Sequence, residues 1–121
     1  MAIAYLVVAV LLAAMTFFSG VGKLRHDPSI VKAIHETCRI PMRYFPFLAA
    51  CEMAGATGVV LGIWWPPLGV AGAAGLVLYF LGAVASHLRV GDSRGIGPAA
   101  FLLSLSVAAL VLRLFQHGSA L

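Results

Sequence analysis

The sequence predicts an all-α integral membrane protein: a four-helix bundle with a short amphipathic helix at the membrane interface, between the first and second spans. Of the 121 residues, 62% are hydrophobic and only 10% are charged, and mean hydropathy is +1.03. A soluble domain of this size cannot hide so much apolar surface. The apolar residues also fall into runs close to the ~20 residues that a membrane-spanning helix needs. These runs cover roughly 3–22, 45–65, 68–88 and 98–115, and we treat 1–121 as a single transmembrane domain.

The first run is interpreted as a retained helix rather than a signal peptide, because no Lys or Arg precedes it and more spans follow. After it, Asp27 and Pro28 form a favourable helix start. Ile30, Ile34 and Cys38 then recur at intervals of four residues. That spacing predicts the short amphipathic helix in the headgroup region, and a solvated loop helix is the alternative.

The second run carries the carboxylate of Glu52, which lies about 9 Å beyond Pro46 at about 1.5 Å per residue. The residues that share its helical face are small or apolar: Ala49, Gly55, Ala56 and Val59. Small residues allow neighbouring helices to approach closely, and Gly58-x-x-x-Gly62 offers a second such surface. Glu52 should therefore face protein rather than lipid. A charge at this depth is a site hypothesis by default, and a purely structural link between helices is the alternative.

The segment Trp64–Pro67 predicts an interfacial turn that makes the second and third helices an antiparallel hairpin. The third helix opens with glycines that form a small-residue surface: Gly69, Gly72 and Gly75. Its polar members include Tyr79, about 13 Å from Leu88, and His87. A polar loop follows, and the fourth helix is expected to begin at Pro98.

Basic residues are distributed unevenly between the two sides of the predicted membrane. The connections after the first and third helices carry Lys23, Arg25, Lys32, Arg39, Arg43, Arg89 and Arg94. The opposite side carries only Arg113, near the end of the fourth helix. The positive-inside rule therefore predicts cytoplasmic connections and both termini outside. This topology, with anionic lipid headgroups, explains the net charge of +4 better than nucleic-acid binding, for which no motif is present.

Three short motifs, taken in order, resemble the DoxX-like family of small membrane proteins. They are Phe17–Leu24 (FFSGVGKL), Glu52–Gly58 (EMAGATG) and Ser86–Asp92 (SHLRVGD). The resemblance implies a four-helix protein of the bacterial inner membrane. It also implies an association, by name, with thiosulfate:quinone oxidoreduction or oxidative-stress complexes. Carried over residue by residue, the matching polar positions are Lys23, Glu52, His87, Arg89 and Asp92.

We consider three functions. The first is an intramembrane site for a lipid-soluble, quinone-like molecule, since Glu52, Tyr79 and His87 can offer donors and acceptors to its carbonyl ends. The second is a structural or assembly subunit that docks membrane partners or further copies of itself. The third is a transporter for a proton or small solute, against which stands the lack of a second intramembrane charge. No metal-ligand spacing, haem ligand pair or redox cysteine pair is evident in the sequence.

Overall fold

The computed structural model describes residues 2–25, 28–31, 40–91 and 93–115, and every regular element in these ranges is helical. The elements are α1 (Ala2–Leu24), α2 (Pro28–Val31), the 3-10 helix η2 (Met42–Tyr44), α3 (Phe45–Leu61), α4 (Pro66–Arg89) and α5 (Ser93–Phe115). Ile3–Leu24, Pro66–Arg89 and Ile96–Phe115 are long and apolar enough to cross a membrane. The predicted all-α membrane fold of four principal helices is confirmed.

The remaining principal helix, α3, is apolar but has only 17 residues, a length of about 26 Å. The short helix predicted between the first two spans begins as α2. Its predicted continuation falls on residues 32–39, which lie outside the described ranges.

The turn between α3 and α4 differs from the prediction, which ran the second helix to residue 65. Trp65 is extended, with φ −131° and ψ 97°, as expected for a residue that precedes proline. Pro66 and Pro67 then begin the first turn of α4. Proline lacks an N–H, but N–H groups in the first turn have no partner within the helix, so no helical hydrogen bond is lost. Consequently α3 ends at Leu61, and the following residues form the turn.

The turn between α4 and α5 is also tighter than predicted. Gly91 has φ +70°, a left-handed conformation that commonly terminates a helix and that glycine adopts without strain. The last long helix then starts at Ser93, so Pro98 lies inside α5 rather than at its beginning.

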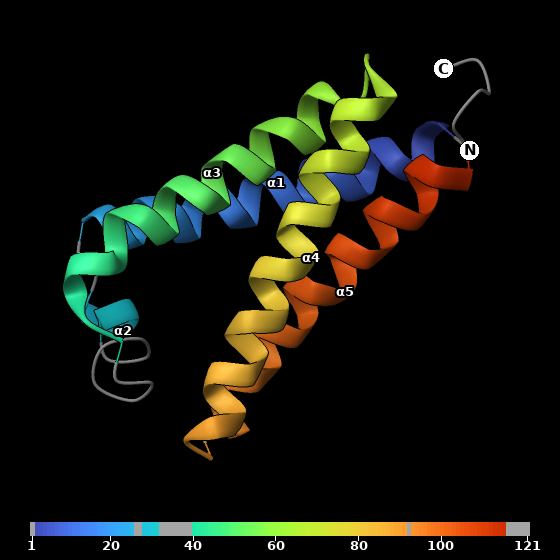
Figure 1. Ribbon diagram of the computed structural model, residues 1–121. Coiled ribbons are helices and arrows are strands. Elements are labelled where there is room, and N and C mark those ends of the chain that lie inside the picture. The colour runs from blue at the N-terminus through green and yellow to red at the C-terminus, as the bar shows by residue number, and fades with distance from the viewer. Residues whose placement is uncertain (1, 26–27, 32–39, 92, 116–121) are drawn as a thin grey trace.

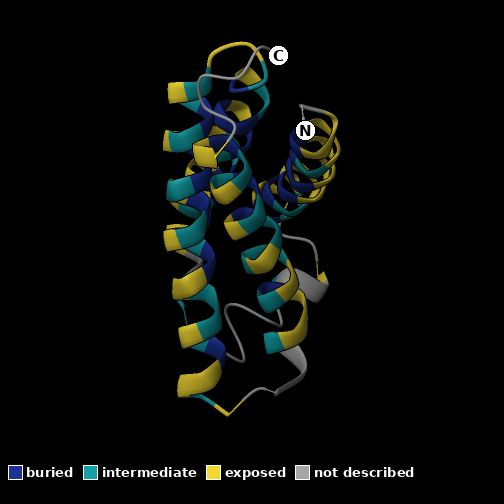
Figure 2. Cartoon of the chain, turned by 90° about the vertical axis from the view of Figure 1, so that its right-hand side faces the viewer, coloured by how far each residue is buried: buried dark blue, intermediate teal, exposed yellow. Residues whose placement is uncertain are grey.

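The helices pack in a ring, with α1 against α3, α3 against α4, α4 against α5 and α5 against α1. Figure 1 shows the α1–α3 and α4–α5 pairs crossing near the turn between α3 and α4 and diverging toward the other end. We call the crossing end the Tyr5 end and the diverging end the Lys23 end. Large apolar side chains on the outward faces of the helices are exposed (Figure 2), as suits contact with lipid.

Glycines bring α3 and α4 together more closely than any side chain would allow. A Cβ on Gly62 would lie less than 2.5 Å from the Gly69 backbone, and one on Gly72 would lie 2.7 Å from the Val59 nitrogen. The predicted small-residue surfaces therefore do face each other. Gly75 is different, because a Cβ there would meet nothing within 4 Å.

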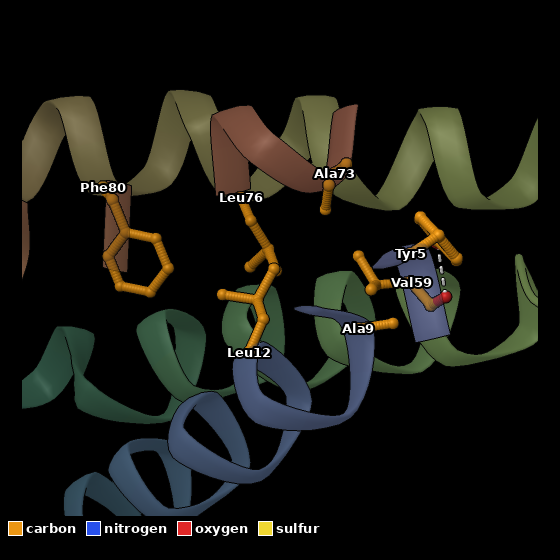
Figure 3. Close-up of a cluster of buried hydrophobic side chains, with 8 residues drawn as sticks. Tyr5, Ala9, Leu12, Val59, Ala73, Leu76 and Phe80 are labelled. Carbon is orange, nitrogen blue, oxygen red and sulfur yellow. Dashed lines mark hydrogen bonds between the residues drawn. The ribbon is translucent and has the colours of Figure 1, made fainter. Parts of the chain in front are cut away.

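The buried core lies between these helices and is assembled from all four of them. It consists of Tyr5, Ala9, Leu12, Val59, Ala73, Leu76, Phe80 and Ala109. Figure 3 shows Leu12 of α1 and Leu76 of α4 pointing toward each other in its middle. This apolar layer separates two buried polar groups of residues, one toward each end of the bundle.

Candidate functional site

Glu52 lies on the buried face of α3 and pairs with Lys23, near the C-terminal end of α1. The Lys23 Nζ donates to Glu52 Oε1 at 2.5 Å, which makes a salt bridge across the α1–α3 interface. Glu52 is completely buried and Lys23 is 5% exposed. The prediction that Glu52 faces protein agrees with this geometry. Lys23, predicted in the connection after the first helix, is instead buried in the last turn of α1.

The α1 side of the site is formed by residues at helical spacing. Ser19 accepts a second hydrogen bond from Lys23 Nζ at 2.9 Å. At Gly20 the two helices approach closely, because an added Cβ would lie 3.1 Å from Met53 of α3. Thr16, one turn earlier, is completely buried on the same side of α1.

Two buried oxygen atoms in this region have no hydrogen-bond partner within the described residues: Glu52 Oε2 and Thr16 Oγ1. Because α1 and α3 are antiparallel and Gly20 lies opposite Met53, Thr16 is level with the turn of α3 around Thr57, five residues or about 7.5 Å beyond Glu52 along the helix axis. An ionised carboxylate oxygen can only accept a hydrogen bond, while a hydroxyl can donate or accept. The interface therefore offers an unused acceptor and an unused hydroxyl that lie more than one helical turn apart along the axis.

Tyr79 of α4 closes the site from the third side. Its ring centroid lies 5.8 Å from Lys23 Nζ, and its ring packs edge-on against Phe80 with centroids 5.2 Å apart. The Tyr79 hydroxyl lies beside the Glu52 carboxyl and interacts with it both electrostatically and as a hydrogen-bonding neighbour, although its approach to Oε2 falls outside ordinary hydrogen-bond geometry. We call Lys23, Glu52, Tyr79 and Thr16 together the Glu52 site.

The other predicted site residues lie farther along the chain. His87 is buried near the end of α4, eight residues or about 12 Å beyond Tyr79 along the helix axis. Arg89 is the last residue of α4 and is exposed. Asp92 lies outside the described residues. The structure thus brings Lys23, Glu52 and Tyr79 together and places His87 and Arg89 toward the Lys23 end.

The comparison with known families agrees with the resemblance of the three motifs. The model of the DoxX-like family matches residues 7–109, which include α3, α4 and most of α1 and α5. The chain belongs to the DoxX-like family. No curated protein and no solved structure matches it.

This DoxX-like protein has a third buried charged residue, Arg113, at the Tyr5 end. Arg113 is completely buried, and its Nη1 donates to the Gly62 carbonyl oxygen at 2.7 Å. Its guanidinium carbon lies 4.4 Å from the centroid of the Tyr5 ring, a cation–π contact. The Tyr5 hydroxyl in turn donates to the Val59 carbonyl at 2.7 Å (Figure 3). We call Arg113, Tyr5 and Gly62 the Arg113 cluster.

Sequence reasoning treated Arg113 as a charge near a helix end and missed its burial. A signal was present, since Ser106 and Ala109 precede it on the same buried face of α5. Together with Glu52, the buried charged residues among those described are Lys23 and Arg113, which lie near the C-terminal ends of two apolar helices.

Proposed function

We propose that this DoxX-like protein binds a lipid-soluble small molecule with a quinone-like head group at the Glu52 site, as a subunit of a membrane redox or oxidative-stress system. The observation that carries the proposal is the completely buried Glu52 carboxylate, whose Oε2 accepts no hydrogen bond of ordinary geometry from the described residues. Buried polar atoms in native proteins are nearly always hydrogen-bonded. A pair that served only to join two helices would be expected to satisfy both carboxylate oxygens.

The chemistry of the unused atoms indicates the kind of head group. Glu52 Oε2 needs a donor, and Thr16 Oγ1 can give a proton to an acceptor. A phenolic hydroxyl can donate to Glu52 Oε2, while another oxygen of the same head group accepts from Thr16. A ring carbonyl can accept from Thr16 or from the third N–H of Lys23, whose other two reach Ser19 and Glu52. The two redox forms of a quinone present these two groups.

Position and surroundings support the same class of ligand. The site lies between α1, α3 and α4, so a ligand would reach it from the membrane rather than from water. Tyr79 contributes an aromatic ring beside Lys23, a suitable neighbour for a planar head group. The Lys23–Glu52 pair places opposite charges side by side where the hydroxyl of a bound quinol would exchange its proton with the Glu52 carboxylate.

The test is retention of a short-chain ubiquinol by purified protein, measured by native mass spectrometry, with its dimethyl ether as a matched probe that cannot donate. The quinol should be retained and the ether retained at least about tenfold less, the effect of one charge-assisted hydrogen bond. Glu52→Gln should lose the quinol. Ser104→Ala is the control, since that exposed hydroxyl bonds only its own helix at Ala100. Equal retention of both probes by wild type and Glu52→Gln, or retention of neither, would contradict the proposal.

A groove on the outer face of α3 and α4 favours the second candidate function, that of an assembly subunit. It has a volume of about 400 Å³ and is lined by Cys51, Ala54, Gly55, Gly58, Leu68, Ala71, Gly72 and Gly75. Small residues of this kind allow another membrane helix to pack closely. Cys51 is a free, exposed thiol in that groove. Slower alkylation of Cys51 in native membranes than in detergent would support a docked helix, and equal rates would argue against one.

A further inference from the structure

Arg113 uses only part of its hydrogen-bonding capacity inside the protein. Its Nη1 reaches the Gly62 carbonyl, and one face of the guanidinium lies against the Tyr5 ring. Its Nε and Nη2 are buried and have no hydrogen-bond partner within the described residues. These two nitrogens project their N–H groups from the same edge of the guanidinium. They form the planar fork that binds both oxygens of a carboxylate or phosphate.

No carboxylate side chain among the described residues provides the Arg113 fork with a counter-charge. The sequence has only four carboxylate side chains, and Glu52 is already paired with Lys23. Asp27 and Glu36 belong to the segment between α1 and α3, and Asp92 to the segment between α4 and α5. Both segments leave from the Lys23 end, whereas Arg113 lies at the Tyr5 end. A buried guanidinium without a counter-charge is costly.

The position of the Arg113 cluster is that of a lipid headgroup region. Arg113 lies two residues before the end of α5, and Gly62 is the first residue beyond α3. Trp64 and Trp65, directly after it, are 73% and 60% exposed. Exposed tryptophans of this kind mark the level of the membrane–water interface. Phosphate groups of phospholipids are concentrated at the same level.

We infer that the Nε–Nη2 fork of Arg113 is a binding site for a phosphate group, supplied by an anionic phospholipid. An anionic lipid fits better than a zwitterionic one, because the Arg113 cluster carries a net positive charge and needs a net negative partner. The fork is covered in the structure. Binding therefore requires the long Arg113 side chain to turn toward the interface, as arginines near helix ends do.

The test compares lipids and variants in the full-length protein. Native mass spectrometry should show one phosphatidylglycerol retained about tenfold better than phosphatidylcholine, consistent with one charge-assisted interaction. Arg113→Lys keeps the charge but removes the fork, and should abolish this preference. Arg43→Lys is the matched control, because Arg43 is exposed at the opposite end. A parallel titration with inorganic phosphate separates the two sources of the group, since a lipid site should not be displaced by it.

A second measurement protects the test against a variant that folds poorly. Phosphatidylglycerol should raise the melting temperature of the wild type and of Arg43→Lys more than phosphatidylcholine does, and should not do so for Arg113→Lys. Equal retention of the two lipids by the wild type would overturn the inference even without a usable variant. Displacement of phosphatidylglycerol by inorganic phosphate would contradict the inference that the bound phosphate group is supplied by a lipid. An unchanged preference in Arg113→Lys would overturn the role of the fork.

Discussion

Removing one partner of the Lys23–Glu52 pair should destabilise the protein far more than removing both. In Lys23→Met the long apolar stem is roughly preserved, but the Glu52 carboxylate loses the hydrogen bond and the counter-charge that Lys23 provides. In the double variant Lys23→Met/Glu52→Leu no charge remains to be buried. The two variants therefore separate the cost of an isolated charge from the loss of the pair itself.

The burial of the two side chains sets the expected magnitude. Exposed ion pairs contribute about 0–1 kcal/mol, whereas breaking a buried pair costs about 3–5 kcal/mol. Lys23 is 5% exposed and Glu52 is not exposed at all, which places the pair in the second class. A carboxylate left alone in a membrane helix is unfavourable by about 3 kcal/mol on insertion scales, a similar value. We expect Lys23→Met to lower the free energy of unfolding by about 3–5 kcal/mol, and the double variant to lie within about 1 kcal/mol of wild type.

The assay is an unfolding titration with a denaturing detergent, followed by tryptophan fluorescence. Both tryptophans of the protein, Trp64 and Trp65, lie in the turn between α3 and α4. Arg43→Met is a control with an exposed basic residue, and should change stability by less than about 0.5 kcal/mol. A loss below about 1 kcal/mol in Lys23→Met would mean that the pair behaves as if it were exposed. A double variant as unstable as the single one would show that packing of the Lys23 and Glu52 methylene chains, rather than their charges, stabilises the contact between α1 and α3.

Three further predictions follow from the packing and the charge distribution. Gly72→Ala should lower the free energy of unfolding by about 1–3 kcal/mol, because its Cβ would lie 2.7 Å from the backbone of α3. Gly75→Ala, with open space around it, should not lower it. The same detergent titration compares the stabilities of the two variants, and equal losses would contradict the close packing. Tyr5→Phe should cost about 1 kcal/mol through the lost hydrogen bond to Val59, and unchanged stability would show that this bond contributes nothing. A reporter that fluoresces only in the cytoplasm should stay dark when fused after Leu121, and a bright fusion would reverse the predicted orientation.

Much of the fold was predictable because apolar runs of membrane-spanning length mark the helices and small residues mark the faces on which they pack. The small residues around Glu52 predicted its inward direction, and the glycines predicted the close contact of α3 with α4. The end of α3 was less predictable. Gly62 continues an apolar run and does not by itself mark a helix end; Pro66, which begins α4, imposes the extended backbone at Trp65.

The partners of the two buried cations could not be predicted from local sequence. Lysine and arginine side chains near a helix end can extend outward to the interface or fold inward. Lys23 folds inward because α3 places Glu52 within its reach, a contact between residues 29 positions apart. Arg113 folds inward because the end of α3 offers the Gly62 carbonyl and α1 offers the Tyr5 ring. Both outcomes depend on which helices are neighbours, and the pattern within one helix does not contain that information.

The position of the ion pair along the chain also bears on how the protein is made. Lys23 and Glu52 belong to the first two long helices, so both residues leave the ribosome before the residues of α4, which starts at Pro66. N-terminal segments are synthesised and can associate first. The carboxylate of Glu52 can therefore meet its counter-charge while the C-terminal half is still being translated. That order matters most for α3, whose 17 residues and buried charge make it the least favourable of the principal helices to insert alone. An α1 helix already in the membrane, with Lys23 in its last turn, would present a counter-charge to Glu52 as α3 inserts.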